Sequence, residues 1–235
     1  MPILERDVIP NLFLPQITAL REAIFNRILP AFDRLDAEAK EIEQEAWEGF
    51  NRHAGEDDDP ASLAEAAFEQ GLEHFEIVSS TLQTIMNVFA VGIEHMFEQQ
   101  RHLLSFRTLN DYEPDSRKRE VGFRALLAEH GIDASRFPQA AKLEELHCVA
   151  NVAKHAEGRA AARLRELRPE LFTHPSIREG PLGRLPPPWG VNSTLIGDDL
   201  FVEPDDLRHY LDAVKAFWEF VLEQIPEPRA GPLAL

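Results

Sequence analysis

Apolar residues recur every three or four positions over most of the chain, which is the spacing of an amphipathic helix. Between Leu14 and Arg52 this spacing is kept, with acidic and basic residues between the apolar ones. Pro30 interrupts the pattern and removes one backbone hydrogen-bond donor. We therefore expect helix over residues 14–52, with a kink or a break near residues 26–30.

A second and longer helical pattern covers about residues 60–106. Asp59 is suited to cap its start, and a proline follows at the first helical position. At about 1.5 Å per residue an unbroken helix would be about 70 Å long, which is longer than a compact domain of this size holds. We therefore expect bends at Gly71, at residues 79–80 or at Gly92. The middle of the pattern is apolar nearly all round, which is typical of the central helix of a bundle.

Further helical segments follow a polar connection at residues 110–120. A short helix ends at Gly131, because glycine suits the left-handed residue that stops a helix. The next helix covers about residues 139–157 and stops at Gly158. An arginine-rich turn or two of helix then covers residues 159–167.

The C-terminal part begins with a proline-rich loop at residues 169–192. Two short β-branched or apolar runs around Gly-Asp-Asp leave room for a short β-hairpin near residues 193–202. An amphipathic helix then covers about residues 204–224. Together the patterns predict an all-α protein, a single-domain helical bundle of about five to seven helices over residues 1–235, with its core at about residues 14–168.

Composition and charge narrow the class of protein. The chain has 24 basic and 41 acidic side chains among 235 residues, a formal net charge of −17. Its far field repels phosphate, which argues against a protein that coats DNA or an anionic membrane. The single cysteine, Cys148, excludes an internal disulfide and multi-cysteine metal sites. The first residues do not resemble a secretory signal, and the most apolar window, residues 85–93, is too short to span a bilayer, so we expect a cytoplasmic protein without membrane contact.

Unusual chemistry gathers on one predicted helix. At about 100° per residue, one stripe of this helix carries a carboxylate, a thiol, a carboxamide and two imidazoles. These residues are Glu144, Cys148, Asn151, His147 and His155. The stripe either faces water or lines a cleft or a dimer seam. In a cleft, histidine is suited to proton transfer near neutral pH, and Lys154 could stabilise an anion.

Two basic islands stand out on the acidic chain. Residues 117–124 and 151–168 each carry a local balance of +3, so the remainder carries −17 − 6 = −23. Either island could hold a phosphate chain, because screening removes the influence of charges beyond about 8–10 Å. In the second island Arg159 and Arg163 are the candidate phosphate ligands. The islands could equally pair with acidic neighbours on helix faces.

The segment NVAKHAEGRAAARLRELRPELF at residues 151–172 resembles the N-x-x-K-H segment and following basic helix of HEPN-like bacterial proteins. FEQQ at 97–100 and AFWEF at 216–220 also resemble members of that group. The resemblance implies an all-α bundle, and many HEPN proteins are dimeric, metal-independent endoribonucleases of toxin–antitoxin or antiviral defence systems.

The resemblance also implies a site, which carries over at His155, Lys154 and Asn151 as catalytic residues. In that interpretation His155 is the general base toward a ribose hydroxyl, and the candidate phosphate ligands hold the RNA or nucleotide. Glu144 and His147 would support the site, and no metal or cofactor is implied.

The chain departs from the HEPN pattern in one respect. In the usual pattern four to six residues separate the catalytic arginine from the histidine, yet residues 148–150 ahead of the segment's histidine contain no arginine. Whether the protein is an enzyme therefore stays open. The alternative is a non-catalytic helical interaction or dimerisation module, with a second copy or a cognate protein as its partner.

A metal centre is a third option. Carboxylate-bridged di-iron bundles use two Glu-x-x-His pairs, and only one such pair is found on the predicted helices, at residues 144–147. A different metal site could combine Glu94, His95 and Glu98 with the stripe at residues 144–155.

Overall fold

A computed structural model of the protein describes residues 5–55, 58–109, 115–178, 190–192, 194 and 199–225. The α-helices are α1 (Leu14–Ala23), α2 (Leu35–His53), α3 (Pro60–Leu109), α4 (Ser116–Glu129), α5 (Ala140–His155), α6 (Arg159–Leu167) and α7 (Pro204–Gln224). Short π and 3-10 segments are η1 (Ile9–Phe13), η2 (Ile24–Ile28), η3 (Leu29–Phe32), η4 (Ala134–Arg136), η5 (Pro169–Phe172) and η6 (Pro175–Ile177). The described residues contain no strand, so the predicted all-α class is confirmed.

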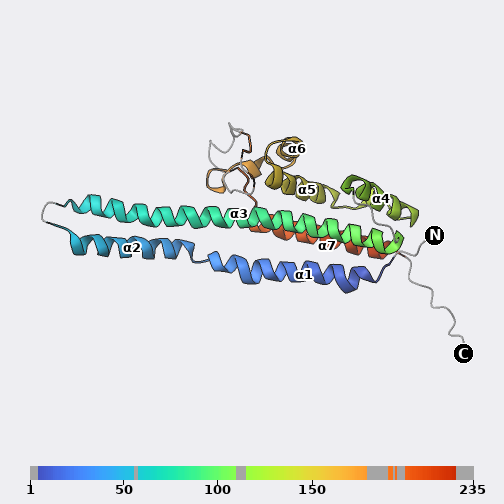
Figure 1. The fold of residues 1–235 in the computed structure, drawn as a ribbon, viewed down its shortest axis with the longest axis horizontal. Helices are drawn as coiled ribbons and strands as arrows, with labels where there is room; N and C mark the ends of the chain where they lie inside the picture. The colour runs from blue at the N-terminus through green and yellow to red at the C-terminus, as the bar shows by residue number, and fades with distance from the viewer. Residues whose placement is uncertain are drawn as a thin grey trace, which may run out of the picture.

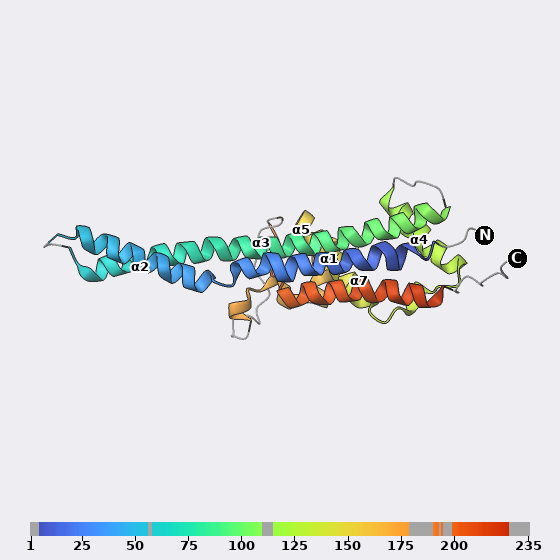
Figure 2. The same cartoon turned by 90° about the horizontal axis from the view of Figure 1, so that it is seen from below.

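The molecule is elongated, with α3 as its spine (Figure 1). Along one part of α3, the helices α1 and α7 lie on one side and the helices α4, α5 and α6 lie on the other. Along the remaining part only α2 accompanies α3, and the two helices project as a hairpin beyond the rest of the molecule in both views (Figures 1 and 2).

The expected bends in the long helix are wrong, because α3 is one unbroken helix of 50 residues. At about 1.5 Å per residue it is about 75 Å long, and the elongated shape accommodates this length. Gly71 serves a different purpose from a bend. A Cβ atom there would lie 2.7 Å from the carbonyl oxygen of Ala39 and 3.0 Å from Cβ of Glu43, so glycine lets α2 approach closely.

The predicted break in the N-terminal helix is confirmed. Regular α-helix ends at Ala23, and residues 24–28 and 29–32 form π and 3-10 turns before α2 begins at Leu35. Pro30 lies in the 3-10 segment, as expected from its missing donor.

Predicted helix ends are mostly confirmed. Gly131 follows α4 with φ of +76°, and α7 covers the predicted residues 204–224. The expected end of α5 at Gly158 is wrong, because the helix ends at His155 and Ala156 adopts the left-handed φ of +59°. Its amide still donates to the Val152 carbonyl, so the helix ends two residues earlier than expected.

Residues 179–189 of the proline-rich loop and residues 193 and 195–198 of the expected hairpin lie outside the described residues. In the first, residues 169–172 and 175–177 form 3-10 turns, where a loop was expected. In the second, residue 194 and residues 199–202 are described and are not in a strand.

The core forms where α3 and α7 meet. Trp218 is fully buried, and its indole nitrogen donates to Oε1 of Gln100 at 2.6 Å. Phe13 and Phe97 pack against the Trp218 ring at centroid distances of 4.7 and 5.8 Å. On the same spine, Asn87 Nδ2 donates to the carbonyl of Leu200 at 2.9 Å, which fixes the segment that leads into α7.

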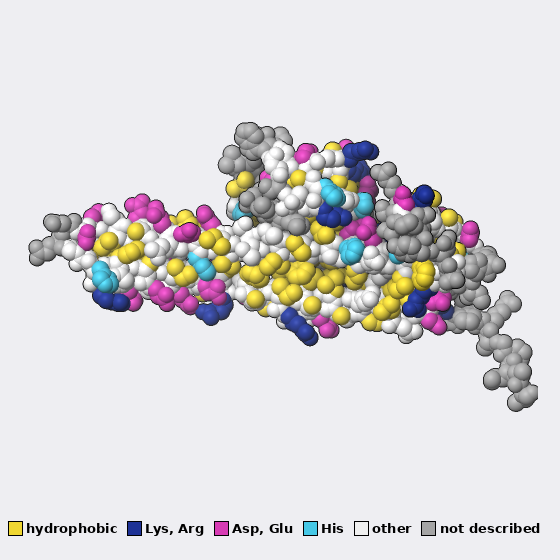
Figure 3. Space-filling view, in the orientation of Figure 1, with side chains coloured by type: hydrophobic (Ala, Val, Ile, Leu, Met, Phe, Trp, Pro, Cys, Tyr) yellow, Lys and Arg dark blue, Asp and Glu magenta, His cyan; other side chains and the backbone are white. Residues whose placement is uncertain are grey.

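Within the described residues, α3 alone is long and apolar enough to cross a membrane, judged by length and composition. Only 22% of its most apolar 18-residue stretch is buried. Apolar side chains accordingly form a band on the face of the molecule seen in Figure 3. Core helices of soluble proteins also satisfy these criteria, so the expected cytoplasmic location and lack of membrane contact stay predictions.

Candidate functional site

A cavity of about 950 Å³ opens between α3, α4, α5 and the turn that contains η4. Aromatic and aliphatic side chains form its apolar lining: Phe97, Phe123, Phe137, Phe217, Ile132 and Leu143. Charged side chains and two histidines also line it: Glu94, Glu98, Arg101, Glu120, Arg124, Asp133, Glu144, His102 and His147. An apolar cavity with a few convergent polar groups is the usual form of a small-ligand site.

Glu94 is the most buried charged group in this cavity, with 3% of its surface exposed. Its Oε1 atom lies 3.0 Å from Nδ1 of His147 and 3.7 Å from an Nη atom of Arg101. Glu98 and Arg101 follow at four and seven positions along α3, so the three side chains lie on the same helix face. The buried carboxylate therefore faces α5 and the cavity.

His147 projects from α5 and is held at both ring nitrogens. Nδ2 of Asn151 lies 3.0 Å from Nε2 of the ring and also donates to the His147 carbonyl at 2.9 Å. With the amide donating, Nε2 accepts, and the proton sits on Nδ1 and is donated to Glu94. The hydrogen bond to Glu94 raises the pKa of His147, and partial burial opposes this effect.

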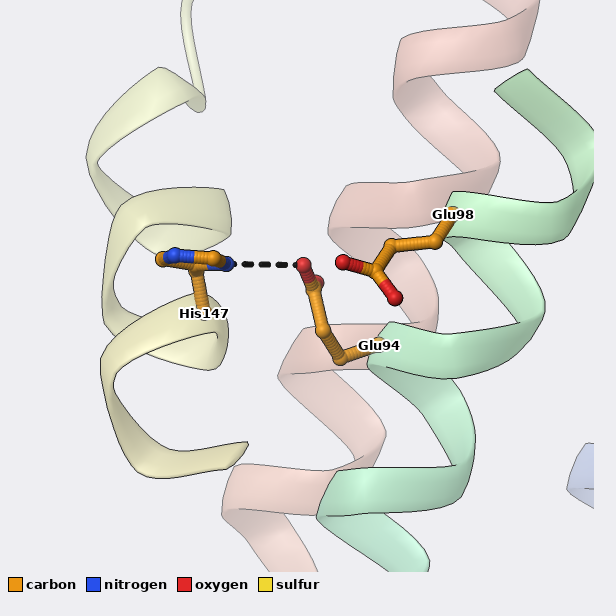
Figure 4. Close-up of side chains that lie close together, drawn as sticks. All are labelled: Glu94, Glu98 and His147. Carbon is orange, nitrogen blue, oxygen red and sulfur yellow. Dashed lines mark hydrogen bonds and ion pairs between the residues drawn. The ribbon is translucent and has the colours of Figure 1, made fainter. Parts of the chain in front are cut away.

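Glu98 completes a cluster with Glu94 and His147, which we call the carboxylate–histidine cluster. One potential ligand atom from each of the three residues lies within 4.8 Å of the other two. Figure 4 shows the two carboxylates converging from α3 while the imidazole reaches them from α5. One nitrogen and two oxygen donors in this arrangement match a site for a divalent transition metal.

The charge of the cavity favours a cation. Its lining contains five carboxylates and two arginines, a balance of 2 − 5 = −3 with the histidines neutral. Both arginines are occupied by carboxylates, because Arg101 and Arg124 each form an ion pair with Glu120. A phosphate group would therefore meet net repulsion here, whereas a metal ion or an amine would be attracted.

The structure separates the residues predicted from the stripe. Asn151 contacts His147, as described above, and Glu144 accepts from Nε of Arg163 at 2.8 Å. Arg163 also donates to Glu166 at 2.8 Å, so two carboxylates neutralise this candidate phosphate ligand. The bond from Arg163 lowers the pKa of Glu144.

The other predicted site residues lie on the outside of the molecule. Lys154 and His155 are exposed in the last turn of α5, and Arg159 is exposed at the start of α6. None of these three residues lines the cavity. Their predicted role in RNA handling stays a prediction.

The sequence indicated part of the cluster. Glu94 and Glu98 were named together with the stripe that contains His147, but His95 was expected beside them. His95 is exposed, and its ring is only a distant partner of Glu98, at 3.8 Å. The contribution of Arg101 was missed, although its spacing from the two glutamates within an apolar helix was a usable signal.

No family model, no curated protein and no solved structure matches the chain. The resemblance to HEPN-like proteins therefore rests on the sequence segments alone and stays a prediction.

Proposed function

We propose that the protein binds a divalent transition-metal ion at the carboxylate–histidine cluster and presents it to the adjoining cavity. The convergence of Glu94, Glu98 and His147 is the observation that carries the proposal. Mixed nitrogen and oxygen donors are typical of Mn²⁺, Fe²⁺ and Zn²⁺ sites. Three protein ligands leave coordination positions for water or for a ligand in the cavity.

The residues around the cluster fit this role. To bind a metal through Nδ1, His147 must carry its proton on Nε2, next to Asn151. Turning the Asn151 amide would then place its oxygen where it can accept that proton, which is the usual support for a metal-binding histidine. Arg101 stays close to Glu94 at 3.7 Å and offsets part of the charge of two adjacent carboxylates.

RNA handling at the end of α5 is the weaker proposal on the present geometry. It depends on Asn151, Lys154 and His155 acting together, yet Asn151 is bonded to His147 and the other two are exposed. Incubating the protein with total RNA, with and without His155→Ala, tests it. Intact RNA in both samples would reject the catalytic version.

Calorimetric titration of chelator-treated protein with Zn²⁺ and with Mn²⁺ tests metal binding. We expect one ion per chain, and an affinity that falls by more than about tenfold in His147→Ala and in Glu98→Gln. Glu144→Gln is the matched control, because it removes a carboxylate from the same cavity but outside the cluster.

The control distinguishes a metal centre from a generally acidic cavity. If Glu144→Gln weakens binding as much as Glu98→Gln, the cluster has no special role. If neither ion binds to the unaltered protein, the proposal is wrong. His95→Ala should leave the affinity unchanged, because His95 lies outside the cluster.

A further inference from the structure

The projecting hairpin has little core of its own. It consists of α2 and residues 60–80 of α3, and we call it the α2–α3 arm. Its buried residues are Leu35, Ala67 and Gly71. Most helices in proteins are stabilised by packing of an amphipathic face, and two helices alone bury only one seam between them. Much of the arm's apolar surface is therefore left without cover.

An apolar stripe remains exposed along the arm. Phe68 and Leu72, which are 53% and 42% exposed, lie four positions apart on α3, and the half-buried Phe75 continues the same face. Residues with this spacing form the seam by which one helix packs against another. Apolar side chains surrounded by acidic ones are visible on the arm in Figure 3.

An acidic row follows the apolar stripe. Glu69, Glu73 and Glu76 have the same spacing on α3 and, at about 100° per residue, lie directly beside it. All three are exposed, and within the described part of the chain none of them forms a hydrogen bond or an ion pair. The arm thus presents an apolar row and an unpaired acidic row in parallel.

The net charge is concentrated on the arm. Residues 35–80 contain two basic and fourteen acidic side chains, a balance of 2 − 14 = −12 out of −17 for the whole chain. A second arm would be repelled by this charge, as would an anionic membrane or a nucleic acid. In a second copy, Arg163 and Arg165 are already paired with glutamates, and the exposed Lys154 and Arg159 lie on polar turns at the end of α5 and the start of α6 and not beside an apolar helix face.

We propose that the α2–α3 arm docks a basic amphipathic helix of a partner protein. The apolar face of that helix would cover Phe68, Leu72 and Phe75, while its lysines or arginines would pair with the row at Glu69 and Glu73. Helix-in-groove recognition uses this combination of apolar anchors and flanking charge. The arm is outside the cavity, so this inference is independent of the proposed metal site.

A designed helical peptide tests the docking surface. The probe contains leucine at heptad spacing with lysine elsewhere, and a second peptide replaces each lysine by glutamate. We expect the basic peptide to bind the full-length protein in a fluorescence anisotropy titration, with an affinity that decreases as salt is added. The acidic peptide should not bind.

Two arm variants and their matched controls locate the site. The first variant neutralises the acidic row with Glu69→Gln, Glu73→Gln and Glu76→Gln. The second removes apolar surface from the stripe with Phe68→Ser and Leu72→Ser. Each variant should bind the basic peptide more than about tenfold more weakly. The controls make equivalent changes at exposed positions off the arm and should leave the affinity unchanged. They are Glu22→Gln, Glu129→Gln and Glu223→Gln for charge, and Val121→Ser and Ile177→Ser for apolar surface.

Circular dichroism of each variant checks that the helices are retained. If the serine variant loses helix, the three exposed glutamine substitutions decide the question alone. Equal binding of the two peptides, or an equal loss in the controls, would overturn the proposal. So would self-association of the chain that the serine substitutions abolish, because the occupant would then be a second copy.

Discussion

At the scale of single residues, the hydrogen bond between His147 and Glu94 sets the protonation of the imidazole. The carboxylate favours the protonated imidazole and so raises the pKa of His147. This stabilisation is complete below the unfolded-state pKa of about 6.5 and is lost as the pH rises through the higher folded-state pKa. A metal ion competes with the same proton, so metal affinity should fall as the pH is lowered through that folded-state value.

The substitution Glu94→Gln tests this coupling. We expect the pKa of His147 to fall toward its ordinary value, because the charged acceptor is replaced by a neutral one. The imidazole proton shifts in an NMR titration measure it, and Glu144→Gln is the control that should leave the pKa of His147 where it was. An unchanged pKa in Glu94→Gln would show that the pair is not formed in solution.

At the scale of helices, close approach and charge pairing hold the layers together. Arg168, which follows α6, pairs with Glu145 on α5 and with Asp206 on α7, the latter at 2.9 Å. Tyr210 donates to the same Glu145 at 2.9 Å. Both carboxylates are buried, so this network ties the α5–α6 layer to α7.

Removing the arginine should leave two buried carboxylates with fewer partners. We expect Arg168→Ala to lower the free energy of unfolding by about 3 kcal/mol, measured by urea denaturation. Arg163→Ala breaks ion pairs that are exposed to solvent, and it should leave the stability nearly unchanged. If the two substitutions lower the free energy of unfolding equally, the buried network contributes no more to stability than the exposed ion pairs.

Gly71 gives a second prediction at this scale. A Cβ atom at Gly71 would push α2 away from α3, so Gly71→Ala should destabilise the arm by about 1 to 3 kcal/mol. Hydrogen exchange should then be faster in α2 and unchanged in α5. Gly92→Ala is the control, because nothing lies within 4 Å of that position and alanine favours helix by about 0.5 to 1 kcal/mol. If hydrogen exchange in α2 is as slow in Gly71→Ala as in the unaltered protein, the close packing of α2 against Gly71 is contradicted.

At the scale of the whole molecule, the sequence predicted the elements better than their arrangement. Periodicity and capping signals located α7 and the break near Pro30, because these signals are local. The unbroken α3 was not predicted, because the bends were expected only if the domain was compact. The arm projects beyond the rest of the molecule, so the helix does not need to bend. The meeting of Glu94 with His147 joins positions 53 residues apart, which helical periodicity cannot specify.

The candidate site was likewise predicted in its local pattern and not in its contacts between helices. The stripe on α5 separated most of its residues from the buried face of Leu146, Val149, Ala150 and Ala153, but Cys148, which was placed on the stripe, is buried in the core. It did not tell which polar residue has a partner on α3. The structure selects His147, which contacts Glu94, and Asn151 holds His147 from within α5. The molecule as a whole therefore has a cation-favouring cavity in its body and a separate acidic arm.

The most direct test of the metal centre is an anomalous scattering map from crystals grown with Mn²⁺ or Zn²⁺. We expect an anomalous peak in contact with Glu94, Glu98 and Nδ1 of His147. A map in which the ion occupies other positions while this cluster stays free of density would contradict it.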